Sequence, residues 1–148
     1  MKWAWLLLIA YFPFSFVGCI KSTADTAVEN SIIGRWELQQ RQVGMMPAVD
    51  YPAGNANSLT FKEATYEVIE NGRVVKSGTY TIMHDASVES EVCLVVPSGE
   101  FQNRIVYDNA PSRKVYLQIT ANKLQLLSGC FALDAGNYET YLKQPTSD

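Results

Sequence analysis

Three cysteines are the residues of this 148-residue chain best suited to covalent chemistry. Cys19 ends an apolar run, whereas Cys93 and Cys130 lie far downstream in sequence of mixed polarity. A cysteine thiolate can be acylated, oxidised to a disulfide or bound to a metal. Zinc sites need clustered Cys and His ligands, and His84 is the only histidine in the chain. Metal ligation is therefore the weakest of the three interpretations.

The residues before Cys19 have the pattern of a lipoprotein signal peptide. Lys2 precedes the apolar run Trp3–Val17, and Gly18 is the small residue before the cysteine. The run of about 15 residues is shorter than the roughly 20 that a transmembrane helix needs, and Pro13 interrupts it. We therefore predict cleavage before Cys19 and lipidation of its thiol. Ordinary signal-peptidase cleavage nearby is the alternative.

Lipidation of Cys19 implies that lipid anchors the protein. One acyl chain holds a protein at a membrane only reversibly, but a lipobox cysteine usually carries a diacylglycerol and an amide-linked acyl chain. Ile20 stands where an aspartate would favour retention in the inner membrane. We therefore expect an exported lipoprotein of the bacterial outer membrane, on its periplasmic or surface side.

Lipidation of Cys19 leaves one pair of thiols, Cys93 and Cys130. Disulfides persist in exported proteins, so we predict that these two cysteines pair. The chain-entropy model gives about 4 kcal/mol for closing a loop of this length. Two buried free thiols are the alternative.

Composition limits the chain to one acidic domain. The net charge is −3, and charges of both signs are scattered without a basic block, so the sequence lacks the electrostatic footprint of nucleic-acid binding. We predict a signal peptide over 1–18, a polar tether without aromatics over 19–31, one domain over 32–144 and a short tail over 145–148. We expect a monomer.

Short strands separated by turn residues fill the predicted domain. Asn71-Gly72 between apolar runs is a strong hairpin signal, and Ala121-Asn122-Lys123 marks a second hairpin. The apolar run Val92–Val96, stopped by Pro97, is expected to be another strand. Residues 42–58 form a long connection, which tends to be functional or mobile. The pattern predicts an all-β fold, a single antiparallel up-and-down β-barrel of about eight strands.

Several segments resemble a known family. Gly34-Arg35-Trp36 resembles the Gly-x-Trp signature of lipocalins, and residues 32–143 resemble the lipocalin-like domains of exported bacterial lipoproteins. The resemblance implies that Trp36 plugs the closed end of the barrel and that Gly34 lets the chain turn tightly there. The arginine that stacks on this tryptophan in the family has no clear counterpart, and Lys143 could replace it through a cation–π contact.

The expected ligand is a small, mostly apolar molecule held inside the barrel. Tyr66, Tyr80, Tyr116 and Tyr138 lie on predicted strands and could line the pocket with apolar rings and hydroxyl tips. Ordinary packing on the sheet surface is the alternative for all four. Tyr138 and Tyr141 are three residues apart, so only one of that pair can point inward.

Catalysis has little support in the sequence. His84-Asp85 could act as an acid–base pair, but it lies in a turn-like run, and no Gly-x-Ser-x-Gly nucleophile motif is present. Asp85, Glu89 and Glu91 miss the spacing of a known calcium loop. We therefore expect a non-enzymatic protein without metal or cofactor. The alternative function is an interaction or inhibitor module with a side-chain-filled barrel, acting through loops 42–58 and 84–91.

Overall fold

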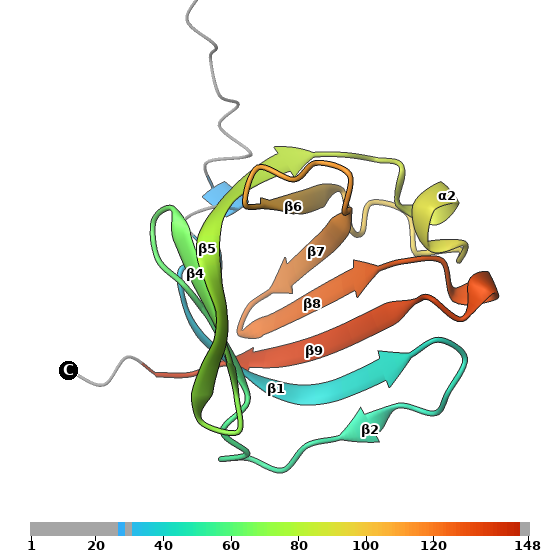
Figure 1. The fold of residues 1–148 in the computed structure, drawn as a ribbon. Helices are drawn as coiled ribbons and strands as arrows, with labels where there is room; N and C mark the ends of the chain where they lie inside the picture. The colour runs from blue at the N-terminus through green and yellow to red at the C-terminus, as the bar shows by residue number, and fades with distance from the viewer. Residues whose placement is uncertain (1–26, 29–30, 146–148) are drawn as a thin grey trace, which may run out of the picture.

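The structure is a computed structural model that describes residues 27–28 and 31–145 (Figure 1). The predicted signal peptide, Cys19 and most of the predicted tether lie outside these residues. Within the described part of the chain, no helix is both long and apolar enough to cross a bilayer.

Nine antiparallel strands form one sheet in the order β2-β1-β3-β4-β5-β6-β7-β8-β9. Their bounds are β1 (Gly34–Val43), β2 (Val49–Asp50), β3 (Ser58–Phe61), β4 (Thr65–Glu70), β5 (Arg73–His84), β6 (Asn103–Tyr107), β7 (Val115–Thr120), β8 (Lys123–Ser128) and β9 (Asn137–Lys143). An additional pairing between β1 and β9 closes the sheet. The two-residue β2 pairs only along the far part of β1, so eight strands form the barrel wall. The predicted all-β, up-and-down barrel is confirmed.

Two tight turns set the register of neighbouring strands. Asn71 and Gly72 both have positive φ, 50° and 76°, as a two-residue type I′ hairpin requires, and they join β4 to β5. Thr120 pairs with Lys123 across the second turn, in which Ala121 has a φ of 51°. Both predicted hairpins are therefore present.

The predicted strand over Val92–Val96 is wrong. Val88–Val92 form the short helix α2, and residues 95–97 follow without regular structure. Val88 and Val92 are four residues apart, so they share one face of the helix. That face is buried in a second apolar cluster, made by α2, the segment after it, the outer face of β7 and β8, and the connection after β8: Val88, Val92, Phe101, Tyr116, Leu127 and Phe131. The apolar run is explained by this outer cluster and not by a buried strand.

A disulfide fastens this cluster to the barrel. Cys93, directly after α2, is bonded to Cys130, directly before the 3-10 helix η1 (Phe131–Leu133). The bond therefore joins the loop between β5 and β6 to the connection between β8 and β9. Figure 1 places α2 and this connection at the same end of the barrel as the turn between β1 and β2.

The other end of the barrel is closed around Trp36, which is fully buried. Its indole Nε1 donates a hydrogen bond to the Ile32 carbonyl at 2.7 Å. The Nζ of Lys143 lies 5.0 Å from the centre of the indole ring and donates to the Ser31 carbonyl at 3.0 Å. Gly34 has a φ of +132°, and a Cβ there would lie 3.0 Å from Cε of Lys143. The cation–π contact predicted for Lys143 is present, and Gly34 leaves room for it.

We predict that Lys143→Met lowers the free energy of unfolding by about 2 kcal/mol. The change removes the cation–π contact and leaves the Ser31 carbonyl without its donor. Urea unfolding followed by tryptophan fluorescence measures the effect, because Trp36 is the only tryptophan after residue 18. Lys123→Met, at an exposed position of β8, is the control. Equal stability of the two variants would contradict this role of Lys143.

Candidate functional site

The barrel interior is filled at one end and hollow at the other. Around Trp36, buried side chains such as Leu38, Phe61 and Leu124 fill the space between the strands. Towards the opposite end lies a cavity of about 200 Å³, the volume of roughly seven waters in the liquid. Each of the eight barrel strands contributes to its lining: Arg41, Leu59, Tyr66, Lys76, Tyr107, Val115, Leu126 and Glu139. The cavity is therefore the inside of the barrel itself.

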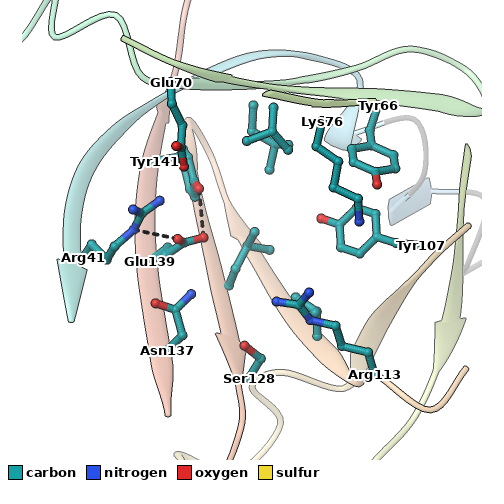
Figure 2. Close-up of a pocket in the computed structure, with 14 residues that line it drawn as sticks. Arg41, Tyr66, Glu70, Lys76, Tyr107, Arg113, Ser128, Asn137, Glu139 and Tyr141 are labelled. Carbon is teal, nitrogen blue, oxygen red and sulfur yellow. Dashed lines mark hydrogen bonds and ion pairs between the residues drawn. The ribbon is translucent and has the colours of Figure 1, made fainter. Parts of the chain in front are cut away.

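The lining of the cavity divides into an apolar part and a polar part. Leu59, Val68, Val115 and Leu126 supply the apolar part. The polar part consists of charged, amide and hydroxyl side chains that Figure 2 shows around the space between β4, β5 and β9: Arg41, Glu70, Lys76, Arg113, Ser128, Asn137 and Glu139, with three tyrosines.

On one wall, Glu139 holds two neighbours in place. Its Oε1 accepts a hydrogen bond from Nε of Arg41 at 2.8 Å, and its Oε2 accepts one from the Tyr141 hydroxyl at 2.8 Å (Figure 2). The Glu139 side chain is only 13% exposed, and these hydrogen bonds replace the contacts with water that burial removes. Burial, and then the nearby charge of Glu139, raise the pKa of Tyr141 well above its ordinary value. Tyr141 therefore stays protonated and acts as a hydrogen-bond donor.

On the other wall, Asp108 organises a second network. It accepts hydrogen bonds from the Tyr66 hydroxyl at 2.9 Å and from the Thr79 amide at 3.1 Å, and its Oδ2 lies 3.3 Å from Nζ of Lys76. The hydrogen bond from Tyr66 is the main cause that lowers the pKa of Asp108. A Cβ on Gly78 would lie 1.8 Å from the Asp108 carboxylate, so the glycine makes room for this network.

Tyr107 packs against Tyr66 with ring centres 4.5 Å apart, and its hydroxyl points into the cavity (Figure 2). Burial raises the pKa of Tyr107, so it too stays a neutral phenol. Neither phenol is available as a base.

Four polar side chains of the lining have no hydrogen bond or ion pair with the described residues. Arg113 reaches toward the cavity from the loop between β6 and β7, and Ser128 and Asn137 lie near it at the ends of β8 and β9 (Figure 2). Glu70 lies on the opposite side. A second, more polar pocket of about 360 Å³ shares Arg113, Ser128 and Asn137. Arg113 therefore stands where the barrel cavity meets solvent.

The four tyrosines predicted to line the pocket lie in three different parts of the structure. Tyr66 lines it. Tyr80 does not line it, contrary to the prediction, because it is buried in the filled part of the barrel, where its hydroxyl donates to the Lys62 carbonyl at 2.9 Å. Tyr116 and Tyr138 belong to the outer apolar cluster, so the prediction that they line the cavity is wrong. Because strand side chains alternate, Tyr141 points inward in place of Tyr138. Tyr107 and Tyr141 line the cavity but are not among the four predicted tyrosines.

A separate polar cluster beside α2 has the residue types of a nucleophilic site. The Ser87 hydroxyl lies 3.0 Å from Nζ of Lys114 and 2.8 Å from the Tyr116 hydroxyl, and it donates to Asp85 at 2.6 Å. A nucleophilic serine needs a neighbouring base. The hydrogen bond to Glu91 raises the pKa of Lys114, so the amine stays charged and does not act as a base.

The carboxylate of Asp85 also makes a poor base. Burial raises its pKa, but hydrogen bonds from the Ser87 side chain and amide, with the charges of Lys114 and Arg104, outweigh burial and lower it. The cluster therefore fits a structural role, in which Asp85 balances the buried Arg104 at 3.1 Å.

His84 is exposed at the end of β5. Among the described residues, no three His, Cys, Asp or Glu side chains gather as a metal site would require.

We predict that Asp85→Asn destabilises the protein at neutral pH by roughly 2–4 kcal/mol, because it leaves Arg104 buried without its counter-charge. A carboxylate with a lowered folded-state pKa adds stability above its unfolded pKa, near pH 4. That stability is lost as the pH falls through the folded-state pKa. Below about pH 4 the difference in the free energy of unfolding between variant and wild type should therefore become smaller, as measured by denaturant unfolding. Asp134→Asn, at an exposed acidic residue, is the control. A difference in stability that does not change with pH would refute this assignment.

No protein-family model, no curated protein and no solved structure matches this chain. The function must therefore be inferred from the geometry and charge of the site itself.

Proposed function

We propose that this chain is an exported, lipid-anchored, lipocalin-like protein that binds a small ligand in the hollow half of its barrel. The observation that carries the proposal is the cavity of about 200 Å³, lined by all eight barrel strands and open near Arg113. Ligand pockets are concave, largely preformed and mainly apolar, with a few placed polar groups. Burial of an apolar ligand surface contributes about 25 cal/mol per Å² before the ordering costs of binding.

The lining favours an amphipathic ligand over a purely apolar one. Arg41 is engaged by Glu139, and Lys76 is engaged by Asp108, so both cations already have counter-charges. Arg113, Ser128 and Asn137 have no such partners in the described structure and could meet the polar end of a ligand. Its apolar part would rest on Leu59, Val68, Val115 and Leu126. The small volume favours a compact molecule over a long acyl chain.

A filled barrel that serves only as an interaction module is the alternative. The filled half around Trp36 is compatible with it, but the cavity beyond that half is not needed for such a role. Binding without catalysis is supported by the states of Lys114 and Asp85, neither of which is suited to activate Ser87.

We predict that Val68→Phe abolishes ligand binding, because the larger ring occupies part of the cavity. Ligand-detected NMR with a library of small amphipathic fragments measures binding to wild type and variants. Val75→Phe, at an exposed position on β5 (55% exposed), should bind fragments as wild type does. Two results would overturn the proposal: no fragment binds the wild type, or binding persists unchanged in Val68→Phe.

For the anchor, we predict that Cys19→Ser moves the protein from the membrane fraction to the soluble fraction and abolishes metabolic labelling with palmitate. The reason is that the serine hydroxyl does not accept the thioether-linked lipid. Cys93→Ser, which keeps Cys19, is the matched control for labelling. Unchanged fractionation and labelling of Cys19→Ser would disprove lipidation at this residue.

A further inference from the structure

Exposed apolar side chains gather at the open end of the barrel. Among the described residues, ten large apolar side chains are exposed, and six of them lie at the end of β1, in the turn after it, in the segment after α2 and in η1: Val43, Met45, Met46, Leu94, Val95 and Leu133. Val95 and Leu133 are 92% and 77% exposed. Contiguous exposed apolar surface of this kind marks interaction sites in soluble proteins.

These segments border a groove on the outer face of the barrel, which we call the outer groove. It has a volume of about 420 Å³, larger than the cavity inside the barrel, and it is lined mainly by apolar side chains: Met45, Leu94, Val96, Phe101, Phe131 and Tyr138. A second hollow of about 380 Å³ continues from Met45 past Val43 and Met46. Met45 lines both hollows.

Covalent and backbone bonds hold the walls of the outer groove together. The Cys93–Cys130 disulfide joins the loop that carries Leu94 to the segment that carries Phe131. The Gly44 amide donates to the Gly136 carbonyl at 2.8 Å, which ties the β1–β2 turn to that same segment. The groove is therefore preformed, which reduces the ordering cost of binding a partner.

Charge and position indicate what the outer groove binds. Its only charged lining residue is Glu100, and the only one in the adjoining hollow is Asp134, within the described structure. We propose that the outer groove docks a segment of another protein in which apolar side chains stand next to Lys or Arg. The apolar side chains would enter the groove and the cation would meet Glu100 or Asp134. Methionine suits such a site because its flexible side chain adapts to different partners.

The same two acidic side chains, Glu100 and Asp134, disfavour two other occupants. In a two-fold dimer the same patch meets itself, so the interface would gather Glu100 and Asp134 from both copies, and neither hollow, among the described residues, supplies a Lys or Arg to pair with them. A bilayer with anionic lipids attracts basic and not acidic surfaces. Moreover, β1 begins at the Trp36 end, so the chain from the proposed lipid anchor reaches the barrel at the end opposite the groove (Figure 1). This last point depends on the proposed anchor; the groove and its charge do not.

Selection from a random peptide library displayed on phage tests the proposal, with the full-length protein held in nanodiscs as the target. We expect enrichment of peptides that combine apolar residues with Lys or Arg. The double variant Met45→Ser/Leu94→Ser should bind them about tenfold more weakly or worse. Val74→Ser/Val75→Ser, an exposed apolar pair on β5, should bind as wild type does. Glu100→Gln/Asp134→Asn should weaken binding and reduce its dependence on salt.

Melting curves establish that each variant is folded before affinities are compared. Failure to enrich any peptide, enrichment of acidic peptides, or equal binding by the Met45→Ser/Leu94→Ser variant would overturn the proposal. So would a dimer in sedimentation that this variant abolishes, because the occupant would then be a second copy. Protection of residues 93–97 by the nanodisc lipid in hydrogen exchange would instead identify the bilayer as the occupant. None of these outcomes affects fragment binding inside the barrel, so the two proposals fail separately.

Discussion

The pairing of β1 with β9 is the interaction on which the rest of the structure depends. Seven residue pairs, from Trp36↔Lys143 to Val43↔Asn137, close the sheet on itself. A closed sheet leaves no unpaired edge among its wall strands, and its inner face must then be filled by its own side chains or by a ligand. The closing strands also bring Trp36 and Lys143 together at one end and Arg41 and Glu139 at the other.

The two ends of the barrel differ in how side chains occupy the interior. At the Trp36 end, aromatic and branched apolar side chains fill the space between the strands. At the other end, charged and phenolic side chains brace one another along the walls and leave the centre open. A polar lining holds water more readily than an apolar one. This division places a packed core beneath a cavity that is open near Arg113.

Local sequence signals were sufficient for most of the fold. Asn71-Gly72 fixed one hairpin because few residues other than Gly and Asn adopt positive φ easily. Gly34 and Trp36 marked the closed end, and counting cysteines led to the Cys93–Cys130 pair. The run Val92–Val96 is predicted to be a strand but contains the end of a helix, because a short helix against the outside of a barrel is as apolar as a buried strand.

The sequence does not determine which tyrosines point into the barrel. Alternation tells which residues share a face of a strand but not which face points inward. The prediction therefore names Tyr138 where Tyr141 lines the cavity, and Tyr116 packs under α2, a helix that the sequence pattern does not indicate. The outer groove was equally hidden, because it is built from three loops that only the closed barrel and the disulfide bring together.

The central claim is that the barrel is filled at the Trp36 end and hollow at the other. Methyl-labelled NMR can test it directly by measuring magnetisation transfer from water to individual methyl groups. We predict transfer to the methyls of Leu59, Val68, Val115 and Leu126, which line the cavity, and none to those of Leu38, Leu117 and Leu124 in the filled half. The absence of transfer to either set, or equal transfer to both, would contradict the account.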